Sequence, residues 1–258
     1  MALLNPAAAA ANSILSPTFV SKDTMRRIIS DIKEIRANPL TAHGIFYEHD
    51  DSEILKGKAL IIGPADTPYA DGFYFFNFKF PANYPHAPPV VEFCTSDVQT
   101  RFNPNLYRSG KVCLSILNTW KGEQWSGCQT LSSVLLSICT VFNEAPLLNE
   151  PGLTKENRDF VNYNKIIAYK NIQVAIVGML NREKIKTDFA CFVEIVNEYF
   201  NKNKEKFRLR IVERKEKEKE METVSTGVYQ LNFNINYSML LEGFDKIYSP
   251  LVKFNHLW

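Results

Sequence analysis

A cysteine and an asparagine lie eight residues apart in a segment with strong turn signals. Cys113 offers the side chain that is the best nucleophile at neutral pH. Asn105 offers amide N–H donors, which can hold a loop or stabilise an oxyanion. Pro104 fixes the backbone before Asn105, and Ser109-Gly110 lets the chain turn back. The pattern predicts that Asn105 and Cys113 are neighbours in space and that the thiol does chemistry.

No base accompanies this cysteine in the sequence. A cysteine hydrolase needs one, normally a histidine, and no histidine lies near Cys113 in sequence; the four are His43, His49, His86 and His256. A thiol with the ordinary pKa of about 8.5 is only a few per cent thiolate at pH 7. That fraction is poor for attacking amides but sufficient for an acyl group that arrives activated. The sequence favours thioester exchange, and a hydrolase whose histidine is brought in by folding stays open.

Further motifs surround Cys113 in a fixed order. They are Gly63-Pro64, Thr67-Pro68-Tyr69, Gly72, Tyr84-Pro85-His86-Ala87-Pro88-Pro89, Phe102-Asn103-Pro104-Asn105, Gly110-Lys111-Val112-Cys113-Leu114 and Trp125-Ser126. In types and spacing, residues 22–182 resemble the ubiquitin-conjugating enzymes. More closely, the chain resembles the large Use1-type class, some of whose members accept a second modifier. That likeness lies in Asn103 in place of histidine, in Thr119-Trp120, in Asn149-Glu150-Pro151-Gly152 and in a helical extension beyond about Ile185.

The resemblance implies a role for each matching residue of the loop. Cys113 carries ubiquitin, or a ubiquitin-like modifier, as a thioester, and Asn105 shapes the loop and stabilises the oxyanion when a lysine attacks. Asn103 takes over the structural task of the usual histidine, since an asparagine can also bond backbone. Ser115 and Glu150 flank the incoming lysine, with Asn149 as an alternative to Glu150. The activating enzyme uses ATP, so we expect this chain to need no cofactor and no metal.

The resemblance also implies surfaces for protein partners. The first helix, with Lys22, Arg26 and Arg27, meets the activating enzyme. A ligase contacts that helix and two loops, one with His86 and one with Ser126-Gly127-Cys128. Here His86 replaces a hydrophobic or aromatic residue and Gly127-Cys128 replaces Pro-Ala. These departures put binding of ordinary RING-type ligases in doubt.

The elements that must position these residues follow from periodicity and turn signals. We expect a helix at Lys22–Arg36 capped by Ser21, then four strands in an antiparallel meander, a long active loop, and helices at Leu131–Phe142, about Lys155–Leu180, Asp188–Phe200 and Asn236–Phe254. The expected strands are Ile45–His49, Lys58–Ile62, Phe73–Phe80 and Val90–Phe93. Residues 202–220 form a charge run of nine Lys/Arg and five Glu, typical of a solvated helix face, and 224–236 alternate weakly. The fold class is α+β.

Length and composition set the remaining expectations. The 258 residues suit one domain with an extension, with a flexible leader at 1–18, a core at 19–182 and a mainly helical extension at 183–258. The formal net charge of +2 gives no argument for nucleic acid. Five cysteines, an odd number without a Cys-x-x-Cys pair, favour a reducing compartment, and no apolar run is long enough to span a membrane. We therefore expect a monomer in the cytoplasm and also the nucleus, whose partners are the modifier, its activating enzyme, a ligase and lysine-bearing substrates. A catalytically silent binding module of the same fold is the alternative, weakened by the intact Cys113 loop.

Overall fold

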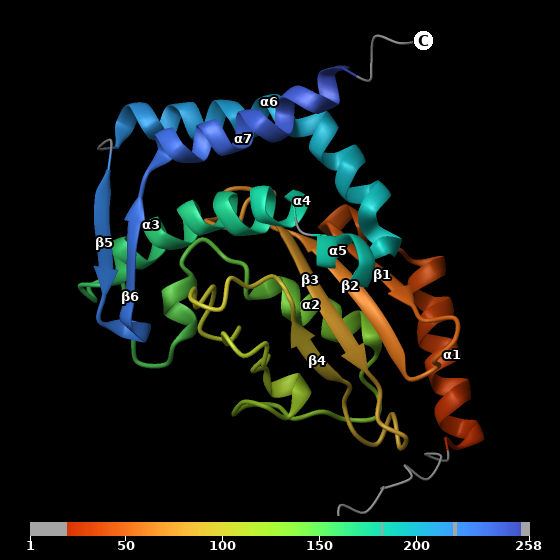
Figure 1. Cartoon of the computed structure of the whole chain (residues 1–258). Helices are drawn as coiled ribbons and strands as arrows, with labels where there is room; N and C mark the ends of the chain where they lie inside the picture. The colour runs from red at the N-terminus through yellow and green to blue at the C-terminus, as the bar shows by residue number, and fades with distance from the viewer. Residues whose placement is uncertain (1–19, 182, 219–220, 254–258) are drawn as a thin grey trace, which may run out of the picture.

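The computed structural model describes residues 20–181, 183–218 and 221–253 (Figure 1). The leader predicted for 1–18 and the last residue of the predicted terminal helix, Phe254, lie outside these ranges. The helices of the described chain are α1 Lys22–Ala37, α2 Leu131–Thr140, α3 Phe160–Lys170, α4 Met179–Asn181, α5 Glu183–Asp188, α6 Val193–Lys217 and α7 Tyr237–Lys253. The strands are β1 Ile45–His49, β2 Lys56–Ile62, β3 Phe73–Lys79, β4 Val90–Phe93, β5 Glu222–Thr226 and β6 Leu231–Ile235.

Strands β1 to β4 form a four-stranded antiparallel meander in chain order, as predicted. No helix separates consecutive strands, and each strand pairs antiparallel with the one before it. The register places Phe76 opposite Ala59 and Phe93, which puts these three side chains on one face of the sheet. The predicted strands are confirmed to within two residues, and the α+β class is confirmed.

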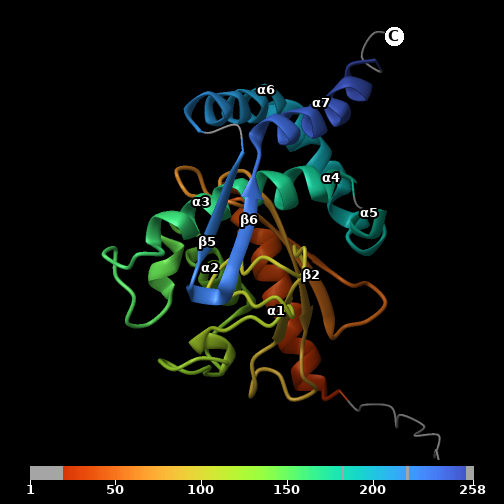
Figure 2. The same cartoon turned by 60° about the vertical axis from the view of Figure 1, so that its left-hand side comes forward.

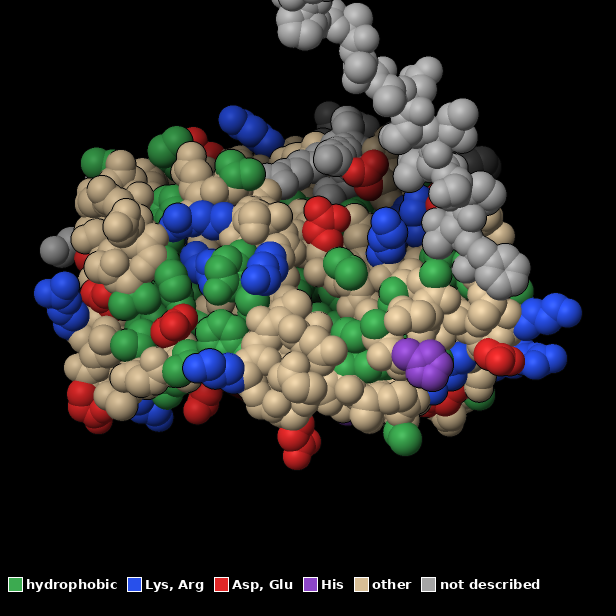
Figure 3. Space-filling model, turned by 90° about the horizontal axis from the view of Figure 1, so that it is seen from below, with side chains coloured by type: hydrophobic (Ala, Val, Ile, Leu, Met, Phe, Trp, Pro, Cys, Tyr) green, Lys and Arg blue, Asp and Glu red, His purple; other side chains and the backbone are tan. Residues whose placement is uncertain are grey.

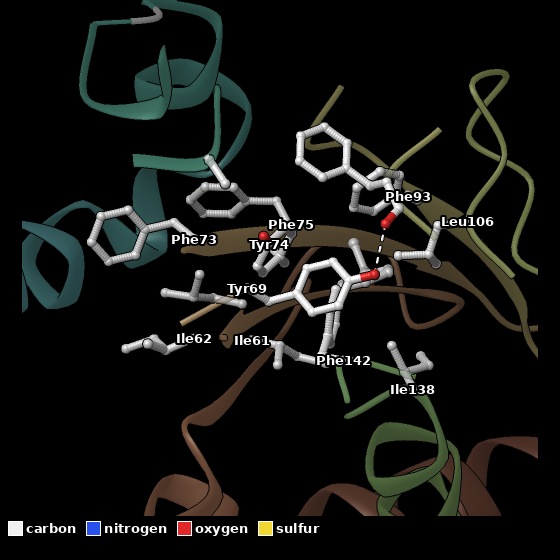
Figure 4. Packing of buried hydrophobic residues seen from close by; sticks show 14 of the residues in the cluster. Ile61, Ile62, Tyr69, Phe73, Tyr74, Phe75, Phe93, Leu106, Ile138 and Phe142 are labelled. Atoms are coloured by element: carbon white, nitrogen blue, oxygen red, sulfur yellow. Dashed lines mark hydrogen bonds between the residues drawn. The ribbon is translucent and has the colours of Figure 1, made fainter. Parts of the chain in front are cut away.

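One face of this sheet packs on the helix that follows the active loop. Tyr74 projects from β3 toward Phe142, just beyond α2, with ring centroids 4.5 Å apart (Figure 4). The Phe76 ring, from the same strand, lies 6.4 Å from that of Phe142. At the start of α1 the Ser21 side chain accepts a hydrogen bond from the Thr24 N–H, which is the predicted cap. Helices α1 and α2 are in contact with each other.

The opposite face of the sheet is covered by the C-terminal extension. Phe73 and Phe75 alternate along β3 with Tyr74 and Phe76, so they lie on the other face of the sheet. Their rings contact aromatic rings of the chain that follows α5. Phe189 lies 4.8 Å and Phe192 6.4 Å from Phe75, and Tyr199 lies 6.0 Å from Phe73, measured between ring centroids. The extension thus completes the core of the sheet, as the position of α5 over β2 and β3 in Figure 1 also indicates.

Two helix boundaries in the C-terminal half differ from the prediction. The helix expected from Lys155 begins at Phe160, because residues 154–159 form hydrogen-bonded turns, and its second half, Asn171–Gly178, is a π-helix. The helix expected at Asp188–Phe200 is wrong in both bounds: a break at Phe189–Phe192 separates α5 from α6. Helix α6 then absorbs the charge run up to Lys217.

The extension is mainly helical, as predicted, and it also contains a β-hairpin that the sequence analysis did not assign. Strands β5 and β6 pair as an antiparallel hairpin between α6 and α7. Figure 2 shows this hairpin running from the layer of α6 and α7 down across α3. Helices α6 and α7 pack together through Phe200, Phe207 and Phe244. None of the helices in the described ranges combines the length and the apolar character needed to cross a bilayer.

Candidate active site

Cys113 lies in the long segment between β4 and α2, paired with Asn105. The Cys113 N–H donates to the Asn105 carbonyl at 2.8 Å, and the Asn105 Nδ2 donates to the Cys113 carbonyl at 2.7 Å. Pro104 and the left-handed Gly110 (φ 87°) shape the reversal between them. The predicted proximity of the two residues is confirmed, and their catalytic roles stay a prediction.

Asn103 is the buried centre of the loop, with 0% of its surface exposed. Its Oδ1 accepts from the Asn105 N–H at 2.9 Å and from the Asn149 Nδ2 at 3.2 Å. Its Nδ2 donates to the Tyr69 hydroxyl at 2.9 Å and to the Val141 carbonyl at 2.8 Å. These bonds use both donors and both acceptor positions of the amide, so Asn103 acts as a structural centre, in line with the expected role.

Two residues that the sequence analysis did not assign to the site also hold this loop. Tyr69 donates to the Phe102 carbonyl at 2.6 Å, the dashed line in Figure 4, and burial raises the pKa of Tyr69 so that it stays a neutral donor. Arg101 lies 3.3 Å from the Tyr107 ring centroid and donates to the Asn103 carbonyl at 3.0 Å. Tyr69 belongs to the Thr-Pro-Tyr motif, which was the available signal. Arg101 had no motif of its own.

The Cys113 residue is 1% exposed, whereas Ser115 on the same loop is partly exposed. Thr119 closes this part of the loop: its hydroxyl accepts from the Leu114 N–H at 2.9 Å and donates to the Val112 carbonyl at 2.8 Å. The loop then returns over Ser115 at Gly122, whose φ of 128° favours glycine. Access to the sulfur is therefore set by the loop that surrounds it.

Glu150 lies on the other side of Asn149 and is partly exposed. Its Oε2 accepts a hydrogen bond from the Tyr229 hydroxyl, which comes from the β5–β6 turn. Burial, together with this bond and the charge of Glu150, raises the pKa of Tyr229, so the hydroxyl keeps its proton. Asn149 joins the Asn103 network directly and Glu150 does not. Sequence reasoning missed Tyr229, which is 79 residues away and has no motif.

The three basic residues of α1 differ in their surroundings. Lys22 and Arg26 are exposed, and Arg26 forms an ion pair with the exposed Asp23 at 3.2 Å. Arg27 is partly buried: it donates to Asp31 at 2.9 Å and to the Gly127 carbonyl at 2.6 Å. Arg27 therefore ties α1 to the Ser126-Gly127-Cys128 loop, while Lys22 and Arg26 remain available to a partner.

The two expected ligase loops lie against each other. The Trp125 indole N–H donates to the Pro85 carbonyl at 2.7 Å, and the Tyr84-Pro85 peptide bond is cis. His86 and the Ser126-Gly127-Cys128 loop are exposed beside this contact. Figure 3 shows the molecule from below, where basic side chains are interspersed with hydrophobic ones rather than gathered into one continuous area.

Neither a histidine nor a metal-binding cluster accompanies Cys113 in the described part of the chain. In that part of the chain the hydrogen-bond partners of Cys113, Asn105 and Asn103 are backbone groups, side-chain amides, the Tyr69 hydroxyl and the Arg101 guanidinium. Within the same ranges no group of three or more His, Cys, Asp or Glu side chains is arranged to hold a metal ion. The site is thus a thiol in a loop rigidified by amides.

The sequence profile described as "Ubiquitin-conjugating enzyme" matches residues 27–170, more than half of the chain, and includes the whole Cys113 loop. The chain belongs to the ubiquitin-conjugating enzyme family. It is 47% identical over 163 residues to ubiquitin-conjugating enzyme E2 Z of Xenopus tropicalis, covering 62% of this chain and 51% of that protein. It is 47% identical over 157 residues to the Homo sapiens protein of the same name, covering 60% and 44%.

A more divergent relative matches over a longer stretch. The chain is 36% identical over 197 residues to "Probable ubiquitin-conjugating enzyme protein 17" of Caenorhabditis elegans, covering 71% of this chain and 26% of that protein. The chain spans about half the length of the E2 Z relatives it matches.

Proposed function

We propose that Cys113 accepts ubiquitin, or a ubiquitin-like modifier, from an activating enzyme and passes it to a lysine. In the first step the Cys113 thiolate attacks the modifier's thioester carbonyl, and the thiolate of the activating enzyme leaves. In the second step a lysine amine attacks the new thioester, an isopeptide bond forms and the Cys113 thiolate leaves. The proton of the attacking amine passes to water. Neither step changes an oxidation state, and neither needs a metal or a nucleotide on this chain.

The observation that supports this proposal best is the amide network behind the thiol. Asn103 and Asn105 fix the backbone on which Cys113 sits, with hydrogen bonds of 2.7–2.9 Å. A hydrolase would need a base to generate its nucleophile. A thioester carrier needs only a held thiol and an activated acyl group, which fits a loop whose partners are amides.

Finer parts of the proposal rest on the resemblance to the Use1-type class. Asn105 stabilises the oxyanion, and Ser115 and Glu150 flank the acceptor lysine. The activating enzyme binds at Lys22 and Arg26 on α1, and a ligase binds near His86 and Cys128, which are exposed. Within this proposal the protein is a monomer of the cytoplasm and nucleus. Its modifier is ubiquitin or a second modifier of the same kind.

A charging assay tests the proposal. The full chain is incubated with ATP and each of a panel of activating enzymes with their modifiers, and products are separated on a non-reducing gel. We expect an adduct that a thiol reductant removes, that Cys113→Ala abolishes and that Cys113→Ser converts into an ester stable to the reductant. Cys191→Ala is the matched control, since Cys191 is exposed in the extension. Absence of an adduct across the panel would support the catalytically silent module instead.

A further inference from the structure

The turn of the β5–β6 hairpin reaches the proposed active site from the C-terminal extension. It consists of residues 227–230, between Thr226 and Leu231. Tyr229 (φ 61°) and Gln230 (φ 51°) both adopt the left-handed conformation, which non-glycine residues rarely adopt and which is strained. Two strained residues in succession persist only where the surroundings hold them, and such strain gathers at functional sites. The contacts of this turn therefore need an explanation.

Three hydrogen bonds from the core hold the hairpin and its turn in place. The Val228 N–H donates to Asp159 Oδ2 at 2.7 Å, just before α3. The Asn162 Nδ2 donates to the Ser225 carbonyl at 2.9 Å. Arg108, between Asn105 and Cys113, donates to the Tyr229 carbonyl at 2.7 Å. The hairpin is thus tied both to α3 and to the loop that carries the thiol.

The Tyr229 side chain is directed by these ties toward Glu150. Its ring lies 5.0 Å from the Arg101 guanidinium and 6.0 Å from the Tyr163 ring. Its hydroxyl donates to Glu150 Oε2, and no hydrogen bond to Glu150 Oε1 is present in the described part of the chain. Tyr229 therefore fixes one oxygen of a partly exposed carboxylate and leaves the other available.

We propose that Tyr229 is a positioning residue for the transfer to lysine: it orients Glu150 so that the free Oε1 receives the acceptor amine. This inference rests on the proposed function and extends it to the C-terminal hairpin. With Oε2 held, Oε1 accepts a hydrogen bond from the lysine Nζ and aligns the amine with the thioester. The C–N bond forms, the C–S bond breaks with Cys113 leaving as thiolate, and the amine proton passes through the carboxylate to water. Tyr229 itself touches no substrate.

The test uses a variant, Tyr229→Phe, that lacks only the tyrosine hydroxyl. The full chain and its Tyr229→Phe variant are charged with the modifier that the charging assay identifies. Discharge of the isolated thioester to free L-lysine is then followed at several lysine concentrations. We expect equal charging but discharge slower by about five- to tenfold at low lysine, the range for one lost hydrogen bond of ordinary strength, because the hydroxyl acts on the amine only through the carboxylate. The substitution should mainly raise the lysine concentration at which discharge is half-maximal, because Tyr229 orients the amine rather than the thioester.

A double-mutant comparison separates positioning from a general structural effect. Glu150→Gln should slow discharge by a similar factor, and adding Tyr229→Phe to it should change little, because the hydroxyl acts through the carboxylate. Tyr199→Phe is the matched control: it removes a tyrosine–carboxylate hydrogen bond of 2.6 Å, to Asp71, in the same extension. Its discharge should match that of the unaltered protein.

Two outcomes overturn the inference, and they differ from failure of the proposed function. If Tyr229→Phe charges and discharges like the unaltered protein, Tyr229 does not position Glu150. If it slows discharge by the same factor with and without Glu150→Gln, its effect does not pass through that carboxylate. If no activating enzyme charges Cys113, the proposed function fails, and this inference fails with it.

Discussion

At the scale of single residues, the Asn103 side chain explains how a long irregular loop keeps one conformation. An amide has two donors and two acceptor positions, and Asn103 uses all four with no surface exposed. A buried polar group that loses such partners leaves them unsatisfied, which costs more than the bonds themselves contribute. The rigidity of the thiol's surroundings thus depends on a residue that never meets the substrate.

We predict that Asn103→Ala lowers the free energy of unfolding by about 2–4 kcal/mol, because several buried groups lose a partner. Urea unfolding followed by circular dichroism measures the change. Asn103→Asp has the same shape but cannot donate to the Val141 carbonyl. It should be at least as destabilising. A neutral result for Asn103→Asp would mean that volume, not hydrogen bonding, accounts for the role of Asn103.

The residues that the sequence could assign to the site are those close to Cys113 along the chain. Asn105 and Asn103 lie within one motif, so turn chemistry alone could bring them near the thiol. Tyr229 and Arg108 are 121 residues apart, and no local pattern predicts their contact. Glu150 was predicted by position, but the hydrogen bond that holds it became visible only in the folded chain. Long-range partners of this kind need the tertiary structure.

At the scale of elements, helix α6 is fixed to the core by a buried carboxylate. The Asp71 side chain is 4% exposed and precedes β3. It accepts from the Tyr199 hydroxyl at 2.6 Å and pairs with Arg210 and, at 3.1 Å, with Lys206. Burial alone would raise the pKa of Asp71, but the hydrogen bonds from Tyr199 and Arg210 and the Arg210 charge hold that pKa below its ordinary value of 3.8.

We predict that protonation of Asp71 lowers the free energy of unfolding in acid. Since its pKa is lower in the folded chain, the unfolded chain binds the proton first as pH falls. The stabilisation is therefore complete above the ordinary pKa and is lost as pH drops below 3.8 through the folded value. Asp71→Asn should lower the free energy of unfolding at pH 7 by about 2 kcal/mol. The free energy of unfolding of this variant should also change less with pH between about pH 5 and pH 3.

Urea unfolding at several pH values measures how the free energy of unfolding changes with pH. Asp51→Asn is the control, because Asp51 is exposed. Because other carboxylates also titrate in this range, the informative quantity is the difference between each variant and the unaltered chain. If Asp71→Asn keeps the full acid slope, Asp71 does not carry the pH dependence that its contacts imply.

The elements were predictable where the apolar period is strong and turn signals mark the ends. Strands β1 and β4 match their predicted bounds, and β2 begins two residues earlier, at Lys56. The β5–β6 hairpin was missed because its strands are short and polar and its turn, Gly-Val-Tyr-Gln, lacks the usual Asn-Gly signal. Helix α6 was divided in the prediction because its charged half has a solvated face and weak periodicity.

At the scale of the whole molecule, the extension and the core share one interior. Phe189 and Phe192 cover β3, Arg108 and Asp159 hold the hairpin, and Asp71 anchors α6. Buried aromatic contacts between the two parts mean that neither surface could face water without cost. Figures 1 and 2 show the result: the extension wraps one face of the sheet and reaches down to the active loop. The C-terminal extension thus contacts the loop that carries Cys113.

We therefore predict that core and extension unfold together, in one cooperative transition. Phe192→Ala should lower the free energy of unfolding by about 3–4 kcal/mol, since Phe192 is 0% exposed against the sheet. Tryptophan fluorescence of Trp120 and Trp125, in a Trp258→Phe background, reports the core, and circular dichroism reports the whole chain. Both signals should shift to the same lower urea midpoint.

The control is Leu209→Ala, at a residue of α6 that is 59% exposed, and it should change the free energy of unfolding by less than about 0.5 kcal/mol. Two separate transitions, or a core signal unmoved by Phe192→Ala, would make the extension an independent module and would remove the structural basis for linking its hairpin to the active site.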